Sequence, residues 1–252
     1  MRIAISGTYS TGKTTTTEAL ALLTGIPRTQ ARTMREILPD AVPGKDLEQC
    51  TPAELIQLGI WRFKERAINE SHAGETFFSD GSCLHEWVYG KARMTVGINP
   101  NLGPVNQWCA SVLGMPVKRV FADVIENMGN AVKQHAKQNY DEFIHLPVEF
   151  PLVKDGHRPV SERFRTLSDE ILLSTLDTLR IPYQVVGGSI ENRLEKIVAL
   201  YDLPQVMSID DAVTQAKAKV SALNAEIAQE ALSRHVQQPS VRRNFMNLLS
   251  RI

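Results

Sequence analysis

Short apolar runs alternate with longer amphipathic segments over the first 200 residues of the chain. The apolar runs predict β-strands at residues 2–6, 76–79, 143–146 and 183–186. The segments between them have helical spacing and predict helices at residues 13–23, 33–38, 51–70, 83–94, 104–138, 167–179 and 190–200, with a break in the 104–138 segment near residues 114–116. Since parallel strands need crossover connections and these connections are helical, we predict a three-layer α/β fold around a mostly parallel sheet.

The pattern changes beyond residue 204, where only helical spacing remains. We expect helices at residues 209–235 and 241–252, separated by Gln237-Gln238-Pro239-Ser240. The chain therefore divides into a domain of residues 1–204 and a C-terminal helical extension of residues 205–252. Such an extension could cover the sheet, bind a partner or join two copies in a homodimer, and its sequence fits each role.

A phosphate-binding motif lies between the first strand and the first helix. It reads G-x-x-x-x-G-K-T and consists of Gly7, Thr8, Tyr9, Ser10, Thr11, Gly12, Lys13 and Thr14, followed by Thr15. Backbone N–H groups of such a loop cradle phosphates, and the positive end of the next helix adds to the attraction. We expect Lys13 to reach the β- and γ-phosphates and the Thr14 hydroxyl to bind Mg²⁺. ATP or GTP is thus the expected cofactor, but kinases, ATPases and GTPases all use this loop.

Asp80 is the candidate for a second acidic group. It ends the strand at residues 76–79, and ligands of open α/β sheets collect at the carboxyl ends of strands. The carboxylate could hold Mg²⁺ or accept the proton of an attacking hydroxyl. Since Asp followed by Gly and Ser is also common at helix starts, Asp80 could instead cap the helix from Cys83.

A basic segment at residues 155–165 contains Arg158, Arg163 and Arg165. We predict that residues 153–166 form a lid, because guanidinium groups neutralise charge on a transferring phosphoryl group. Helical spacing prevents all three side chains from facing one ligand, so Arg158 is the first candidate for catalysis. Arg163 and Arg165 are predicted to bind the nucleotide. The ordinary alternative is an exposed helix start with surface ion pairs.

Three further residues are candidates for the acceptor side of the cleft. Gln30 and Arg32 follow the first helix, and His85 follows Asp80 by five positions. A histidine at a helix start is also commonly solvated or hydrogen-bonded without contacting a ligand. We therefore predict these three positions as substrate-binding while keeping that alternative for His85.

The overall charge narrows the class of partner. The 28 Lys and Arg residues balance 28 Asp and Glu residues, which argues against nucleic acid as the main ligand. No apolar run approaches the roughly 20 residues that span a bilayer, and the first residues enter a strand without a signal-peptide pattern. We expect a cytoplasmic protein that does not bind membranes.

The motifs in this order resemble the nicotinamide-riboside-kinase domain of the NadR type and related nucleoside- and nucleotide-kinase-like P-loop proteins. The resemblance covers about residues 1–200 and is carried by the phosphate loop, Ala31-Arg32, Phe78-Ser79-Asp80, Tyr140-Asp141, Asp155-Gly156-His157-Arg158 and residues 183–193. It implies five parallel strands, Mg-ATP and a lid arginine. The chain departs from the family at Thr29-Gln30, where the family often has an acid, and at Gly81, where related kinases have Arg.

These observations predict a kinase that transfers the γ-phosphoryl group of ATP to a hydroxyl of a nucleoside-like or other small metabolite. Lys13, Asp80 and Arg158 are the predicted catalytic residues. A switch or assembly ATPase without a small-molecule acceptor is the alternative. A signalling GTPase is disfavoured, because the sequence contains no Asn-Lys-x-Asp motif to read guanine.

Overall fold

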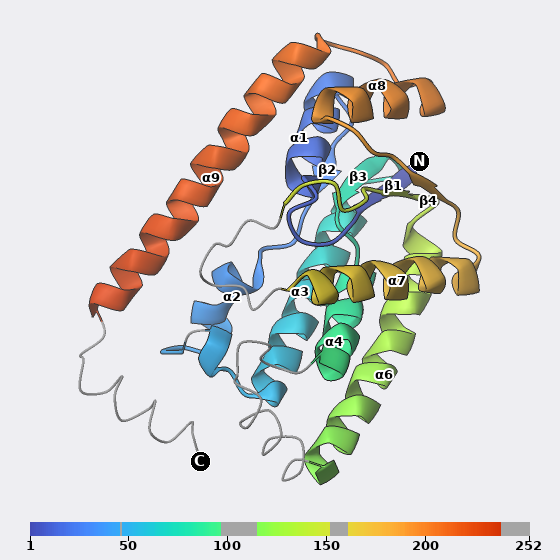
Figure 1. Ribbon diagram of the computed structural model, residues 1–252. Helices are drawn as coiled ribbons and strands as arrows, with labels where there is room; N and C mark the ends of the chain where they lie inside the picture. The colour runs from blue at the N-terminus through green and yellow to red at the C-terminus, as the bar shows by residue number, and fades with distance from the viewer. Residues whose placement is uncertain (46, 97–114, 152–160, 238–252) are drawn as a thin grey trace.

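The structure is a computed structural model that describes residues 1–45, 47–96, 115–151 and 161–237 (Figure 1). Five strands form its central sheet, in the order β2-β3-β1-β4-β5, and every neighbouring pair is parallel. The strands are β1 (Arg2–Ser6), β2 (Arg28–Thr29), β3 (Phe77–Asp80), β4 (Glu142–His145) and β5 (Tyr183–Val185). The register pairs Ile5 with Asp80 and Ser6 with His145, so the carboxyl ends of β1, β3 and β4 meet at one edge.

Helices cover both faces of the sheet, because alternate strand residues point to opposite sides. On one side Ile3, Ile5 and Phe78 pack in a core with residues of α1 (Lys13–Thr24), α8 (Ile190–Tyr201) and α9 (Ile209–Gln237). On the other side Ala4 and Phe77 pack with α4 (Leu84–Val96), α6 (Met115–Asn139) and α7 (Glu162–Leu179). This three-layer α/β arrangement confirms the predicted fold class.

The helices α2 (Met34–Ala41) and α3 (Pro52–His72), with a short 3₁₀ turn at Leu47–Gln49, form a third apolar cluster. Both helices begin at a capping box, in which Thr33 and Thr51 accept from the backbone N–H of Glu36 and Glu54. The glutamate side chains accept in return from the backbone N–H groups of the capping residues. These caps fix where the two helices start on the β2 side of the cleft.

Most observed elements agree with the predicted ones to within a few residues, with two differences. The strand β2 was not among the strands predicted from the apolar pattern. The helix α7 begins at Glu162, inside the segment predicted as a polar lid. Ser161 caps it by accepting from the N–H of Phe164, whose ring is fully buried. Residues 153–160 of the predicted lid, the predicted helical residues before 115 and the predicted helix at 241–252 lie outside the described residues.

Within the described residues, no helix has both the length and the apolar character needed to cross a membrane.

Candidate functional site

The phosphate loop joins β1 to α1 through backbone conformations that only some residues adopt. Gly7 has a φ of 136°, and a Cβ placed there would lie 2.6 Å from the carbonyl oxygen of Leu146. A side chain at this position would therefore collide with the backbone that follows β4. Ser10 also has a positive φ, of 61°. The glycine that the motif places at position 7 is therefore the residue that this backbone conformation requires.

Side chains from within and outside the loop bind its carbonyl groups. Arg193 of α8 donates to the carbonyl of Thr11 at 2.6 Å, Lys13 donates to that of Thr8 at 2.6 Å, and His85 Nε2 lies 3.2 Å from that of Gly7. In a trans peptide the N–H points away from the C=O. These hydrogen bonds therefore orient the N–H groups of residues 8, 9 and 12 in the opposite direction, as a phosphate-binding loop requires.

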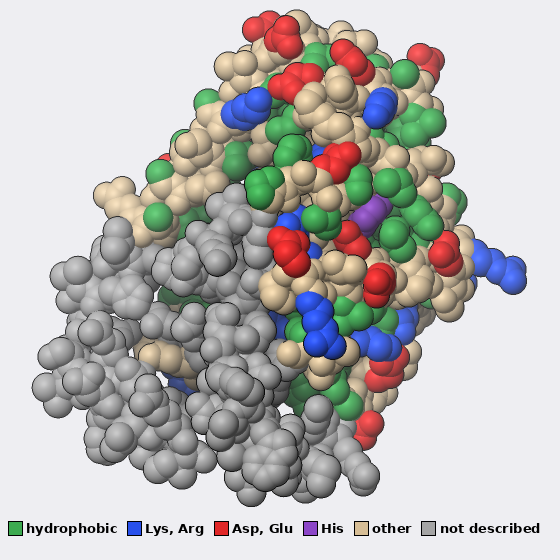
Figure 2. All heavy atoms as spheres, viewed as in Figure 1, with side chains coloured by type: hydrophobic (Ala, Val, Ile, Leu, Met, Phe, Trp, Pro, Cys, Tyr) green, Lys and Arg blue, Asp and Glu red, His purple; other side chains and the backbone are tan. Residues whose placement is uncertain are grey.

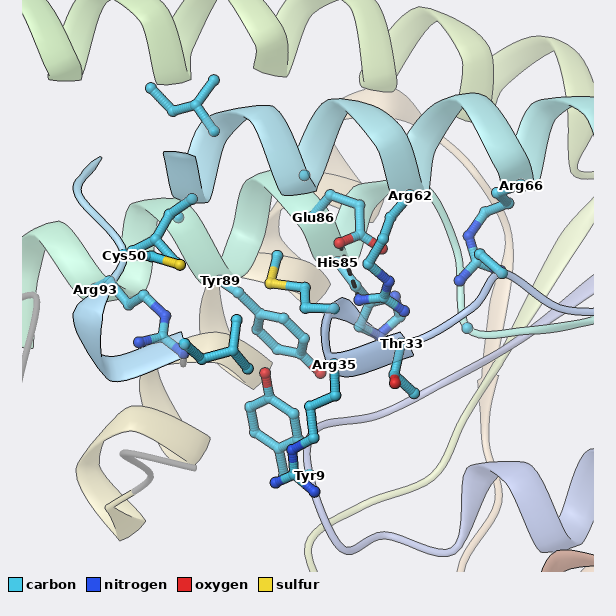
Figure 3. Close-up of a pocket in the computed structure, with 18 of the residues that line it drawn as sticks. Tyr9, Thr33, Arg35, Cys50, Arg62, Arg66, His85, Glu86, Tyr89 and Arg93 are labelled. Atoms are coloured by element: carbon cyan, nitrogen blue, oxygen red, sulfur yellow. Dashed lines mark hydrogen bonds and ion pairs between the residues drawn. The ribbon is translucent and has the colours of Figure 1, made fainter. Parts of the chain in front are cut away.

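A cavity of about 310 Å³ extends from the phosphate loop across the carboxyl end of β3 to α3 and α4. Lys13 and Thr14 of the phosphate loop and Asp80 at the end of β3 line one part of it. Arg62 of α3, with Glu86 and Tyr89 of α4, lines another part (Figure 3). This volume falls in the range of pockets that enclose small molecules. One continuous cavity therefore connects the phosphate loop with room for a second ligand.

Thr14 and Asp80 offer a hydroxyl and a carboxylate oxygen to the same cavity. Such oxygen donors, completed by phosphate oxygens and water, suit Mg²⁺. Among the described residues, no three His, Cys, Asp or Glu side chains form a metal-binding group of their own. The residues present thus fit a metal that enters with a nucleotide.

The first backbone hydrogen bonds of α4 run from the N–H groups of His85 and Glu86 to the carbonyl oxygens of Ser82 and Cys83.

An ion pair lies inside the cavity, between α3 and α4. Arg62 Nη1 donates to Glu86 Oε2 at 3.0 Å, and the Glu86 side chain has no exposed surface. Glu86 Oε1 is buried and has no hydrogen-bond partner. Arg62 is held in place by a second hydrogen bond, from Nε to the carbonyl of Arg32 at 3.0 Å. Because a buried carboxylate oxygen without a partner is costly, Oε1 is ready to accept from a ligand.

Aromatic rings form another wall. Tyr9, a side chain of the phosphate loop, stacks on Tyr89 of α4 with ring centroids 4.8 Å apart. Phe164 of α7 packs 5.7 Å from Tyr89, and the guanidinium of Arg93 lies 5.6 Å from the Phe164 centroid. Figure 3 shows the Tyr9 and Tyr89 rings together beside the labelled arginines of the cavity. The phosphate loop thus contributes to the apolar surface of the second part of the cavity.

A buried guanidinium holds the backbone of Asp80 in place. Arg66 of α3 donates to the carbonyl of Asp80 at 3.0 Å and to Ser79 Oγ at 3.1 Å, and Ser79 in turn donates to Glu70. Burial opposes ionisation of Glu70, but the hydrogen bond from His135 and the charge of Arg66 keep its pKa lowered. The carboxylate of Glu70 therefore offsets the positive charge of Arg66, and the hydrogen bonds of Arg66 fix the position of the end of β3.

His85 is buried in its neutral form. The backbone N–H of Ser82 donates to Nδ1 at 3.0 Å, which leaves Nε2 as the donor to the Gly7 carbonyl. Burial, and then the charges of Lys13 and Arg66, lower the pKa of His85 well below its usual 6.5. His85 therefore links the loop after β3 to the start of the phosphate loop.

A known protein family matches the sequence of this chain. The sequence pattern that defines an AAA domain matches residues 2–193, which is most of the chain. The chain belongs to this AAA-domain family. No curated protein sequence matches it.

Two solved structures similar to this AAA-domain protein are of deoxyadenosine kinase from M. mycoides. The form with bound dATP has a TM-score of 0.53 at 15% sequence identity, covering 80% of this chain and 100% of that chain. The form with bound dCTP has a TM-score of 0.49 at 15% identity, covering 80% and 99% of the two chains. The likeness to the dATP-bound form, at this identity, establishes the fold alone, a three-layer α/β fold with a P-loop.

Of the residues predicted from the sequence of this AAA-domain protein, the structure gathers Tyr9, Lys13, Thr14, Asp80 and His85 around one cavity. The predicted acceptor residues Gln30 and Arg32 do not line it. The carboxylates of Glu65 and Asp40 bind Arg32 at 2.6 and 2.9 Å and raise its pKa, while Gln30 accepts from Arg28.

The three arginines of the basic segment differ in position. Arg163 is exposed on the first turn of α7 and does not line the cavity. Arg165 is buried, where it pairs with Glu162 at 3.1 Å and donates to the carbonyl of Phe150 at 3.0 Å. Arg158 lies outside the described residues. The roles predicted for these arginines in binding the nucleotide remain predictions.

Sequence reasoning did not identify Arg62, Arg66 or Arg193 as site residues. All three lie on helices. Their neighbours in the sequence do not distinguish them from arginines on an exposed helix face. The departure at Gly81 was a partial signal: this residue has a φ of 83°, and a Cβ there would lie 3.4 Å from Arg66 Nη2. Arg66 of α3 thus supplies a guanidinium beside the position where related kinases have Arg.

Proposed function

We propose that this protein is an ATP-dependent kinase that transfers the γ-phosphoryl group to a hydroxyl of a small, nucleoside-like metabolite. The observation that carries the proposal is the single cavity with Lys13, Thr14 and Asp80 along one part and Arg62, Glu86 and Tyr89 along another. A nucleotide-binding loop that opens into a further part of the same cavity, here called the chamber, is the arrangement that direct transfer between two bound small molecules requires.

Each residue near the loop has a proposed role. Backbone N–H groups of the loop and Lys13 bind the phosphates, and Thr14 and Asp80 hold Mg²⁺, which offsets negative charge when bound. The Asp80 carboxylate also orients the acceptor hydroxyl for in-line attack. Neutral His85 and the Arg193 guanidinium keep the loop carbonyls turned away from the phosphates.

The chamber supports a nucleoside-like acceptor. The Arg62 guanidinium donates and Glu86 Oε1 accepts, so together they complement a group with both an acceptor and a donor, such as the amide edge of a base. The stacked Tyr9 and Tyr89 rings offer an apolar surface for a planar ring. The deoxyadenosine-kinase fold supports the same class, whereas an acceptor of the NadR type has no separate support.

The surface favours a small ligand over a polyanion. Figure 2 shows Lys and Arg side chains interspersed with Asp and Glu on the described part of the face in view. Formal charges also balance over the whole sequence. A broad basic face, as expected for a nucleic-acid-dependent ATPase, is not part of this view.

The test is incubation of the protein with Mg-ATP, or Mg-GTP in a parallel reaction, and a pool of nucleosides and other metabolites, followed by mass spectrometry. We expect one pool member to gain a phosphoryl group, and Lys13→Ala to abolish that product while remaining folded. Slow release of ADP and phosphate without a phosphorylated acceptor would instead support a switch or assembly ATPase. Full transfer by folded Lys13→Ala would refute the assignment of the site.

A further inference from the structure

The helix α9 contributes two residues to the cavity, although it lies outside the matched AAA domain. Asn224 and Ile227 line the same cavity as Lys13, Asp80 and Glu86. The family match ends at residue 193, and α9 begins at Ile209. The binding site of this chain therefore includes an element that the family pattern does not contain.

The first half of α9 is anchored firmly to the domain. Ala212, Val213 and Ala216 are buried in the core that α1 shares with the sheet. Lys219 of α9 pairs with Glu18 of α1 at 3.1 Å, and the N–H of Val206, just before α9, donates to the carbonyl of Leu23. Since increasing residue numbers on α9 meet decreasing numbers on α1, the two helices run antiparallel.

This direction takes the second half of α9 to the phosphate-loop end of α1. From Ala216 to Ile227 the helix advances about 16 Å at 1.5 Å per residue. The half-buried side chains Val220, Leu223 and Ile227 continue the stripe of Val213 and Ala216 at spacings of three and four residues. Figure 1 shows α9 passing α1 and continuing toward α2. The face of α9 that packs in the core along its first half therefore lines the cavity along its second half.

Glu18 connects α9 to the opposite wall as well. Its carboxylate pairs with Arg28 of β2 in addition to Lys219, and it is only 6% exposed. The strand β2 leads directly to Ala31 and Thr33, which also line the cavity. One buried carboxylate thus fixes two walls of the cavity relative to α1.

We propose that α9 is a specificity wall, on which Ile227 and Asn224 contact the acceptor and limit its size and polarity. Ile227 supplies an apolar surface, and the Asn224 amide supplies a donor and an acceptor for a hydroxyl or ring nitrogen. This proposal rests on the proposed kinase function and deepens it. It assigns these two side chains to the acceptor and not to the nucleotide, and separate KM values for the two substrates test that assignment.

The test compares Ile227→Trp, Ile227→Ala and Asn224→Ala with the control Ala225→Trp. Ala225 is exposed on the same helix, does not line the cavity, and receives the same bulky side chain in the control. The probe is an equimolar pool of the four ribonucleosides and four deoxyribonucleosides with Mg-ATP. Products are measured by mass spectrometry, and the KM of the favoured nucleoside and of ATP are determined for each variant.

We expect Ile227→Trp to raise the nucleoside KM about tenfold or more, because steric misfit in a pocket changes discrimination by about 10- to 200-fold. Ile227→Ala should broaden the set of nucleosides phosphorylated, and Asn224→Ala should change their ranking. Ala225→Trp should match the wild type, and the KM for ATP should stay within about twofold throughout. Circular dichroism and melting temperature establish that each variant is folded.

The outcomes separate the two proposals. If the wild type phosphorylates no nucleoside, the nucleoside-kinase assignment is refuted, and the specificity wall with it. If the wild type is active but all folded variants keep its nucleoside KM and ranking, the wall alone is refuted. A rise in the KM for ATP without a change for the nucleoside would also overturn it, because α9 would then contact the nucleotide.

Discussion

The guanidinium of Arg193 lies 2.6 Å from the carbonyl oxygen of Thr11, 182 residues away in sequence. Arg193 is fully buried, pairs with Glu149 at 3.0 Å and lies 4.9 Å from the centre of the Phe150 ring. The helix α8 therefore holds the phosphate loop in place through the hydrogen bond from Arg193 to Thr11. We therefore expect nucleotide binding to depend on a residue remote from the loop in sequence.

Replacing Arg193 with Met should weaken ATP binding and destabilise the fold by about 2–4 kcal/mol, because a buried charged donor is lost and its acceptors remain. Calorimetric titration with Mg-ATP and urea unfolding measure the two effects. Lys196→Met is the control: it removes an exposed cation from the same helix that also donates to a carbonyl, that of Gly187. Equal ATP affinity in the wild type and both variants would contradict the proposed support of the loop.

His85 should make stability depend on pH. Its pKa is lowered in the folded protein, so between the unfolded value near 6.5 and the folded value the unfolded chain binds more protons. The stabilisation is therefore complete above pH 6.5 and is lost as pH falls toward the folded pKa. His85→Gln should cost about 1–3 kcal/mol at pH 7.5, and this difference from the wild type should shrink by pH 5.5.

Urea unfolding at several pH values measures this trend. The exposed His72 provides a control, since His72→Gln should cost much less stability at pH 7.5 than His85→Gln. A constant difference between wild type and His85→Gln over this range would show that His85 is not buried as a neutral group.

Asp80→Asn should separate binding from transfer. The amide keeps the shape of the side chain and the backbone carbonyl that accepts from Arg66, so the fold should be retained. Because an amide neither balances the charge of Mg²⁺ nor accepts a proton, turnover should fall at least about 100-fold, while much of the ATP affinity remains. Steady-state rates and calorimetry measure the two quantities, and an unchanged rate would leave Asp80 with a structural role only.

Glu86→Gln should affect the acceptor and spare the nucleotide. The change removes the charge that compensates Arg62 and replaces one acceptor oxygen in the chamber. We expect the KM of the acceptor to rise about tenfold or more, since a site built to hydrogen-bond a ligand group discriminates strongly. Glu65→Gln, on α3 but outside the cavity and paired with Arg32, is the matched control. Equal acceptor KM values in both variants would exclude Glu86 from the acceptor site.

The sequence alone determined the phosphate loop and most of the helices and strands. Glycine and lysine at fixed spacing and apolar periodicity are local signals, so they can be recognised without the fold. The strand β2 was harder to identify, because it has only two residues and is defined by its pairing with Phe78 and Ser79. The early start of α7 depended on burial of Phe164, which is also a property of the folded chain.

The part of the cavity that we assign to the acceptor was decided by tertiary structure. Arg62 and Glu86 are 24 positions apart, Arg66 reaches Asp80 from another helix, and Asn224 and Ile227 come from the far end of the chain. Gln30 and Arg32 were close to the site in sequence, yet Arg32 found carboxylates outside the cavity. Local sequence signals encode a loop that binds phosphate through its own backbone, whereas a chamber formed by several helices is set by their packing.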